Sequence, residues 1–312
     1  MRILGFARYA LGACGAAVMF AGCSGGSPLA PTPAAQNAAP ASSRVALGGS
    51  WMAPDLNLKK KDLLYVPSGN EILVFTYPGG KPVGALTGIT GPTGECTSST
   101  SKGNWWVVAS GEILEYAHGG TSPISTLKVA GLVSNCAVDP ISGDLAAVTS
   151  DGIVVYRHAR GRGKTYATPN GFFDGYDNKG NLFVDGFNGN YAFTLVELPK
   201  GSNSFETITL NQTIEFPGGV QWDGRYLAVE DQQTSNVYQF AISGTNGTLK
   251  GTTTLQGASD IGGSWIQRHD LVGADAGNDD VEIWRYPTGG MSVKTICSNC
   301  FPTGVVVSVA PK

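Results

Sequence analysis

Two short segments, forty residues apart, each carry a side chain with an oxygen donor followed by a cysteine. Glu95 is followed by Cys96, and forty residues later Asn135 is followed by Cys136. Carboxylate and amide oxygens are ligands that a hard cation such as calcium accepts, and two thiols in the right geometry can form a disulfide bond. Either chemistry requires a fold that brings these two distant segments to matching places.

A second group of polar side chains lies in the last third of the chain. Its acidic and amide members are Glu230, Asp231, Asp260, Asp275, Asn278 and Asp279, and two further cysteines follow at Cys297 and Cys300. Such side chains in neighbouring loops can form an acidic pocket for a cation or a polar ligand. Asp and Asn are also common in ordinary turns, so the alternative is plain turn chemistry.

The histidines give no sign of a catalytic centre. His118, His158 and His269 each lie beside a predicted turn, and no HExxH or i,i+4 pair of the zinc-enzyme type occurs. The sequence also has no GxSxG elbow, phosphate-binding loop or dinucleotide fingerprint. We therefore expect solvent-facing turn histidines and predict no catalytic residues.

These residues are distributed over an internal repeat. A β-like run, a turn and a second β-like run recur six times, from Asp62–Val66 with Glu71–Gly80 to Asp270–Val272 with Val281–Gly290. The copies are 42, 40, 37, 44 and 45 residues apart when aligned on Leu63, Trp105, Leu145, Leu182, Tyr226 and Leu271. Runs rich in β-branched and aromatic residues predict hairpins, and this period matches one four-stranded propeller blade.

We therefore predict an all-β fold, a six-bladed β-propeller of four-stranded antiparallel blades over residues 61–312. A polar run after each hairpin should form the outermost strand, and a short run before the next hairpin should form the innermost strand. The last innermost run, Val305–Val309, has no later partners, so we expect it to pair with Leu63–Val66 and close the ring. Closure leaves no sheet edge exposed.

The N-terminal residues have the pattern of an export signal. Arg2 and Arg8 precede an apolar stretch, 9–21, that is too short for a conventional membrane-spanning helix. The residues Phe20-Ala21-Gly22-Cys23 resemble the bacterial lipobox, which implies a signal peptide over residues 1–22 and lipid attachment at Cys23. Ser24 implies sorting to the outer membrane. The alternatives are an ordinary signal peptide and a structural Cys23.

The composition of residues 23–60 predicts a flexible tether, because this segment is rich in Pro, Ala, Ser and Gly and shows neither strand nor helix periodicity.

The chain as a whole is weakly charged, with 14% charged residues, a formal net charge of −3 and 44 glycines. A chain without a cationic excess is not expected to bind nucleic acid. We expect an exported protein held by its lipid anchor at the cell envelope, at the outer membrane.

Disulfide bonds are expected in an exported protein with four cysteines beyond Cys23. Cys96 and Cys136 each lie nine residues before the aligned residue of their copy, so they should sit at the same height on neighbouring innermost strands. We predict the bonds Cys96–Cys136 and Cys297–Cys300. The alternatives are pairing of Cys300 with Cys96, a four-thiolate zinc site and a redox-active Cys297–Cys300 pair.

Blade topology sorts the loops between two faces of the ring. Connections between strands 1 and 2 and between strands 3 and 4 of each blade lie on one side, which we call the first face, and the others lie on the second face. Arg157, Arg160, Arg162 and Lys164 belong to the first face. The second face should carry the acidic and amide group, Glu230, Asp231, Asp260, Asp275, Asn278 and Asp279.

The repeats resemble the NHL/YncE-like class of bacterial propellers. The resemblance lies in Pro302–Val307, in Asn135–Pro140 with Gly143–Leu145, and in Lys179–Asp185, which match the pattern P-x-G-V-A-V-D followed by G-N-L-Y-V-A-D. Such motifs specify a fold rather than an activity. Six-bladed propellers also include metal-dependent lactonases similar to gluconolactonase, and that resemblance implies Glu95 and Asn135 as ligands of an axial ion.

The sequence favours a non-catalytic binding or scaffold module, a monomeric propeller whose partner is an envelope protein, peptide or glycan. No cofactor is predicted. The alternative function is a metal-dependent, lactonase-like hydrolase with an axial divalent cation such as calcium. The tryptophans Trp105, Trp106, Trp222, Trp265 and Trp284 are expected to pack between blades, the alternative being sugar-stacking platforms.

Overall fold

The computed structural model describes residues 49–54, 57–97, 103–168 and 170–312. The predicted signal peptide, Cys23 and most of the predicted tether lie outside these residues. The described chain consists of β-strands and loops with two short 3₁₀ turns, η2 (Leu58–Lys60) and η3 (Arg157–Ala159). Among the described residues, no helix is long and apolar enough to cross a membrane.

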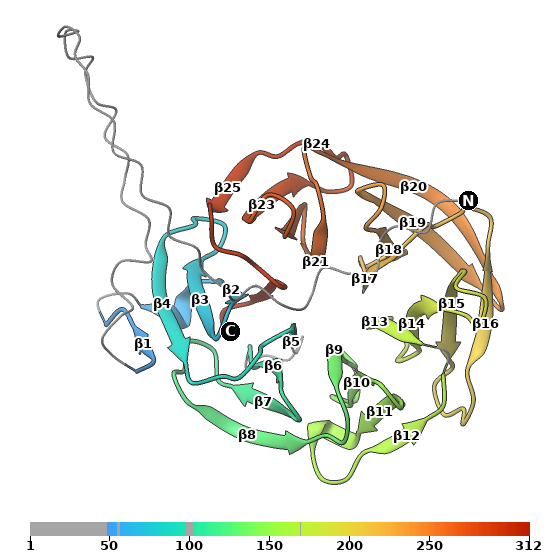
Figure 1. Ribbon diagram of the computed structural model, residues 1–312, viewed down its shortest axis with the longest axis horizontal. Helices are drawn as coiled ribbons and strands as arrows, with labels where there is room; N and C mark the ends of the chain where they lie inside the picture. The colour runs from blue at the N-terminus through green and yellow to red at the C-terminus, as the bar shows by residue number, and fades with distance from the viewer. Residues whose placement is uncertain (1–48, 55–56, 98–102, 169) are drawn as a thin grey trace, which may run out of the picture. The chain divides into compact units, whose positions relative to one another are not determined.

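Three sheets are four-stranded and antiparallel, and in each the strands follow chain order from the centre of a ring to its perimeter (Figure 1). The first consists of β5 (Gly94–Thr97), β6 (Trp105–Ala109), β7 (Glu112–Tyr116) and β8 (Pro123–Lys128). The second consists of β9 (Val133–Val138), β10 (Leu145–Thr149), β11 (Gly152–Tyr156) and β12 (Lys164–Tyr166). The third consists of β21 (Ile261–Gln267), β22 (Asp270–Asp275), β23 (Asp280–Arg285) and β25 (Lys294–Cys297).

A nine-stranded sheet contains two more antiparallel sets of four. One set is β13 (Gly171–Tyr176), β14 (Leu182–Phe187), β15 (Phe193–Leu198) and β16 (Glu206–Leu210), and the other is β17 (Pro217–Trp222), β18 (Leu227–Asp231), β19 (Asn236–Ser243) and β20 (Asn246–Gln256). The outer strands β16 and β20 pair in parallel, and β20 also pairs in parallel with the short β24 (Gly290–Met291). The described residues therefore form five hydrogen-bonded sheets where the repeat predicted six separate ones.

The remaining sheet joins the two ends of the described chain. Its order is β1 (Trp51–Met52), β4 (Pro82–Thr87), β3 (Glu71–Thr76), β2 (Leu63–Ser68) and β26 (Val306–Ser308). β26 pairs antiparallel with β2, with Leu63 opposite Ser308 and Tyr65 opposite Val306. The C-terminal strand thus closes the ring as predicted, and β1, which lies within the predicted tether range, extends this sheet outward along β4.

Burial along the strands explains why the repeat is readable. The second strand of each set is buried along all or nearly all of its length, as in β6 and β10, because both of its faces pack against neighbouring sheets. Outer strands such as β8 are largely exposed. Near the axis, a Cβ at Gly175 would lie 2.3 Å from the Val220 oxygen, so only glycine permits this approach of β13 to β17. The arrangement is an all-β propeller with four-stranded antiparallel blades.

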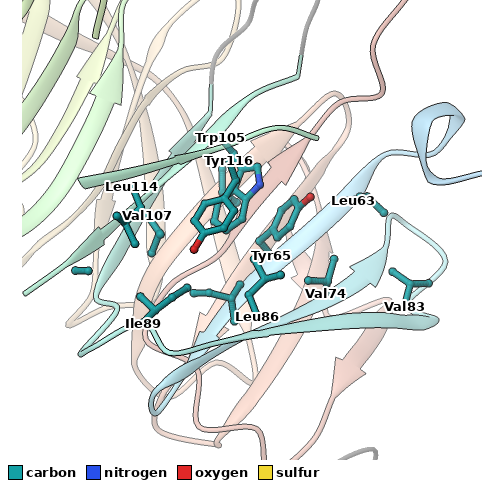
Figure 2. Close-up of a cluster of buried hydrophobic side chains, with 13 residues drawn as sticks. Leu63, Tyr65, Val74, Val83, Leu86, Ile89, Trp105, Val107, Leu114 and Tyr116 are labelled. Atoms are coloured by element: carbon teal, nitrogen blue, oxygen red, sulfur yellow. The ribbon is translucent and has the colours of Figure 1, made fainter. Parts of the chain in front are cut away.

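The sheets pack through large side chains that fill the spaces between them. Between the β2–β4 and β5–β8 sheets, Tyr65 stacks on Trp105 with ring centroids 4.0 Å apart, and Trp105 stacks on Tyr116 at 4.9 Å (Figure 2). Trp105 and Trp284 are fully buried. Trp106 is also buried, in the cluster around the Cys96–Cys136 bond, so the expected packing role is confirmed for these three tryptophans. Trp222 and Trp265 are half-buried.

His118 differs from the expectation of a solvent-facing turn residue. Its ring is half-buried, with Nδ1 2.6 Å from Ser308 Oγ and Nε2 3.0 Å from the carbonyl oxygens of Leu58 and Lys61. It therefore fastens η2 to the closing strand β26. His158 and His269 are exposed at turns, as expected.

Candidate functional site

The inner strands enclose a small cavity on the ring axis, toward the second face. Its volume is about 60 Å³, and a water molecule needs roughly 10–15 Å³ on this measure. The start of β5, interior residues of β9, β13, β17 and β21, and the segment before β26 form its walls. The cavity can hold a few water molecules or the end of one side chain.

Glu95, the first residue singled out in the sequence, lies in this cavity wall on β5. Its side chain is buried, and neither carboxyl oxygen has a hydrogen-bond partner among the described residues. The Cβ that any other residue would place at Gly304 would lie 2.7 Å from Glu95 Oε2, so the glycine leaves room for this carboxyl group. Burial raises the pKa of Glu95 well above its ordinary value.

Asp174 on β13 is a second buried carboxyl group in the same wall. Both of its side-chain oxygens also lack a partner among the described residues, and burial raises its pKa well above the ordinary value. Sequence reasoning missed this residue. The available signal was a charged side chain inside the predicted innermost strand 172–176, where an ordinary buried strand would carry an apolar residue.

Glu230 and Asp185 form a second layer of carboxyl groups behind the cavity. Glu230 Oε2 accepts hydrogen bonds from Ser264 Oγ at 2.7 Å and from the Gly219 amide at 3.2 Å. Burial raises the pKa of Glu230 to about 7. Asp185 accepts from the amides of Phe173 and Gly218, each at 3.0 Å. Burial, reinforced by the nearby Glu230 and Asp174 carboxyl groups, raises the pKa of Asp185 well above its ordinary value.

The site is rich in hydrogen-bond acceptors and poor in donors. Both oxygens of Glu95, both of Asp174 and Oε1 of Glu230 are buried without a partner among the described residues. Of the described side chains that line the cavity, Trp265 supplies the one buried nitrogen that also lacks a partner. Buried oxygens of this kind are satisfied by protonation or by a ligand that brings donors, such as water or an ammonium group.

Asn135 lines the same cavity but is already engaged. Its Oδ1 accepts the amide of Cys136 at 2.6 Å. In the part of the chain that the structure describes, no group of three or more His, Cys, Asp or Glu side chains could hold a metal ion. The structure places Glu95, Asn135 and Asp174 at one cavity.

The other predicted members of the acidic group do not meet at the cavity. Asp231 and Asp275 are fully buried, and each holds the loop that precedes the inner strand of its own four-stranded set. Asp231 accepts the amides of Glu215 and Phe216, and Asp275 accepts those of Ser259 and Asp260. These two are turn-organising residues.

Three residues of the predicted group remain in the loops of the second face. The Asn278 side chain is exposed and donates to the Gly257 carbonyl and to Asp275. Asp260 is exposed just before β21, and Asp279 has a left-handed backbone conformation between β22 and β23. Of the six residues predicted as an acidic rim, only Glu230 adjoins the axial cavity through Ser264.

The disulfide bonds follow the predicted pairing. Cys96–Cys136 joins the neighbouring inner strands β5 and β9 with a Cα–Cα distance of 5.6 Å, and Cys136 lines the cavity. Cys297–Cys300 lies between β25 and β26 with a Cα–Cα distance of 6.0 Å. The first bond holds together the two strands that carry Glu95 and Asn135.

An aromatic patch made of Phe172, Phe187 and Phe216 lies on the second face. The three rings meet edge to face with centroids 5.3 to 6.4 Å apart. All three side chains are half-buried and lie at the second-face ends of β13, β14 and β17. An apolar surface therefore borders the acidic cavity.

Comparison with known proteins identifies the fold. Neither the scan against protein-family models nor the search of curated proteins gave a match. A chain of the crystal structure of a nidogen/laminin complex is similar with a TM-score of 0.65 and 12% identity, over 80% of this chain and 100% of that chain. The Cps50 (Swd1) β-propeller domain of Myceliophteria thermophila is similar with a TM-score of 0.54 and 12% identity, over 79% of this chain and 85% of that chain. A structure of streptogramin B lyase has a TM-score of 0.48 and 14% identity, over 80% of this chain and 74% of that chain.

At sequence identities this low, the similarity shows the fold alone: the protein is a β-propeller. Propellers carry many unrelated functions, so function has to be argued from the site.

Proposed function

We propose that the protein is a non-catalytic binding module whose axial cavity accepts a cationic, hydrogen-bond-donating group from an envelope protein, peptide or glycan. The observation that carries this proposal is the pair of carboxyl groups of Glu95 and Asp174, buried in the cavity wall without a partner among the described residues. A protonated primary amine supplies three donors and a positive charge in a group small enough for the cavity.

The surroundings of the cavity support a cationic ligand. Asp151, Glu215 and Asp260 are exposed in loops of the second face, whereas Lys128 is the one Lys or Arg at that face among the described residues. Negative potential at the entrance steers and orients a positively charged partner. The patch of Phe172, Phe187 and Phe216 offers apolar surface to the rest of such a partner.

The proposal also includes the number of blades, the export of the protein and its lipid attachment. We count the ring as six blades, because six antiparallel sets have inner strands β26, β5, β9, β13, β17 and β21, two of the sets being joined at their outer edges. The NHL/YncE-like resemblance supports this count. Export, lipid attachment at Cys23 and an outer-membrane location rest on the residues Phe20 to Ser24. The lactonase-like hydrolase is the alternative proposal, and Glu95, Asn135 and Asp174 at the same cavity are the residues that would serve it.

Titration with a model amine tests the ligand proposal. We expect N-acetyl-lysine amide to bind and raise the melting temperature, and its uncharged isostere N-acetyl-norleucine amide to do neither. Because burial raises the pKa of Glu95 and Asp174, binding a cation should release protons and tighten as pH rises. Calorimetry in buffers of different ionisation enthalpy measures this release.

Matched variants make the test specific. Glu95→Gln or Asp174→Asn should weaken amine binding by about tenfold or more, the value of one charge-assisted hydrogen bond. The control is Glu215→Gln, which removes an exposed carboxyl group from the same face outside the cavity. Equal binding of both amides, or stabilisation by calcium but not by the amine, would contradict the proposal.

The anchor is tested separately by labelling. Cells that express the full chain should incorporate labelled palmitate into it, and Cys23→Ala should abolish the label. Persistence of the label in the variant would exclude Cys23 as the attachment site.

A further inference from the structure

The basic side chains are segregated on the face of the ring opposite the proposed ligand entrance. The chain has 21 Lys and Arg residues, of which Arg2, Arg8, Arg44 and Lys102 lie outside the described residues. Of the other 17, fifteen lie in or beside the connections of the first face, and the exceptions are Lys128 and Lys250. The segregation extends around the ring.

The positive charges of the first face are exposed and mostly free. All fifteen side chains are exposed, and only Arg268 and Arg285 form ion pairs with described residues, Asp62 and Asp270 respectively. Nine acidic residues share this face, which leaves a formal side-chain charge of +6. Only Glu206 of these nine is exposed, and the other eight are buried or half-buried.

The acidic residues of this face are used to build its turns. Asp177 accepts the amides of Lys179 and Asn181, and Asp223 accepts those of Arg225 and Tyr226. Carboxylates that cap backbone amides are turned toward the protein. The positive side chains are therefore the charges that this face presents to a partner.

The first face contains a groove in which three of its basic side chains lie close together. It lies between the β9–β12 and β13–β16 sheets and has a volume of about 320 Å³. Its charged rim includes Arg157, Lys164 and Lys200, none of which forms an ion pair with a described residue. Lys164 Nζ donates to Asn203 Oδ1 at 2.6 Å and lies 4.4 Å from the Tyr166 ring centre, which holds its charge over the groove.

The apolar floor of the groove and the hydrogen-bonded state of its two carboxylates favour an amphipathic ligand with an anionic head group. Leu182 and Leu198 provide apolar floor residues. The two carboxylates in the groove are occupied: Asp139 accepts from the Ile141 amide and Ser142 Oγ, and Asp144 accepts from the His158 amide. An anionic head group can thus meet three cations above an apolar base.

The described chain enters the ring on this same face. Lys59, Lys60 and Lys61 form η2 and its C-terminal cap immediately before β2, and all three are exposed. His118 fixes this segment against β26. These lysines add to the basic surface at the point where the N-terminal segment joins the propeller.

We propose that the first face binds the surface of an anionic lipid bilayer, with the groove between the β9–β12 and β13–β16 sheets taking a phosphate-bearing head group. Charge complementarity carries the choice of partner, because exposed lysines and arginines near an anionic membrane each strengthen binding by about fivefold. The acidic second face then points away from the bilayer. This interaction does not require lipidation of Cys23.

Vesicle sedimentation tests the proposal with the full chain carrying Cys23→Ala, so that every sample has the same N-terminal segment and none is lipidated. We expect stronger binding to phosphatidylcholine vesicles that contain phosphatidylglycerol than to pure phosphatidylcholine. Raising the salt to about 1 M, where the Debye length is about 3 Å, should abolish the difference. Equal binding to the two compositions would overturn the proposal.

Two double variants locate the surface. Arg157→Gln with Lys200→Gln removes two charges from the groove, and Lys128→Gln with Lys250→Gln removes two exposed charges elsewhere. The groove pair should lower the partition coefficient on anionic vesicles by roughly 30-fold and the matched pair by much less. Equal losses would indicate net charge alone and contradict the proposed face. Binding of inorganic phosphate without binding of vesicles would make the groove a small-anion site and also overturn membrane docking.

Discussion

Ionisation of Glu230 provides a quantitative test of the carboxyl groups around the axis. The side chain is fully buried, and burial raises its pKa from 4.5 to about 7. A group that binds its proton more tightly when folded stabilises the fold below its unfolded pKa and loses that contribution as pH rises through its folded pKa. Its contribution to stability should therefore fall between pH 4.5 and about 7. The total loss is about 3 kcal/mol.

The informative variant is Glu230→Gln, which keeps the shape of the side chain and cannot ionise. Its carbonyl oxygen can still accept from Ser264 Oγ and from the Gly219 amide. The free energy of unfolding in guanidinium chloride should be nearly the same for both proteins at about pH 5. By about pH 8 the variant should have gained about 2.5 kcal/mol relative to the wild type, since part of the total loss occurs below pH 5.

The difference between the two curves isolates Glu230. Glu95, Asp174 and Asp185 also have raised pKa values and destabilise both proteins as pH rises, so their contributions largely cancel. Glu215→Gln, an exposed change on the same face, should give a curve parallel to the wild type. Parallel curves for Glu230→Gln and wild type would refute the assignment of a high pKa to this carboxyl group.

Two further predictions concern stability, and both are measured by guanidinium unfolding at fixed pH. Replacing Cys96 and Cys136 by serine should cost about 4 kcal/mol in the chain-entropy treatment, because the bond closes a loop of 40 residues. Replacing Cys297 and Cys300, which are 3 residues apart, should cost about 2 kcal/mol; a reversed order would contradict that treatment. Trp105→Ala should cost about 3–5 kcal/mol because it removes the middle ring of a buried stack. The matched change Trp51→Ala, at a side chain 41% exposed, should cost less than about 1 kcal/mol.

Much of the fold was accessible from the sequence because each blade repeats the same burial pattern. The second strands are buried on both faces and read as continuous apolar runs, so they could be aligned residue by residue. That alignment correctly placed Cys96 beside Cys136, and the leftover innermost run 305–309 was correctly expected to pair with the strand that begins at Leu63. The outer strand β12 and the parallel contact between β16 and β20 were not predictable, since short exposed strands carry little apolar pattern.

The candidate site was only partly accessible from the sequence. Glu95 and Asn135 could be brought together because they occupy equal positions in consecutive copies. Asp174 was missed because an acidic residue in a predicted inner strand has no motif of its own. Asp231 and Asp275 were predicted to face a ligand, yet they cap backbone amides. Sequence position alone does not show whether a carboxylate in a turn points outward or back toward the chain.

The pairing of β20 with both β16 and β24 gives the ring unequal stiffness. Three neighbouring blades are tied at the perimeter by backbone hydrogen bonds and should move as one plate. In the rest of the ring, among the described strands, adjacent blades are joined by side chains and by the Cys96–Cys136 bond at the inner radius. Asp174 and Ser264 lie on the rigid half of the cavity wall and Glu95 on the compliant half. An entering side chain would therefore press against a fixed wall while the opposite wall yields.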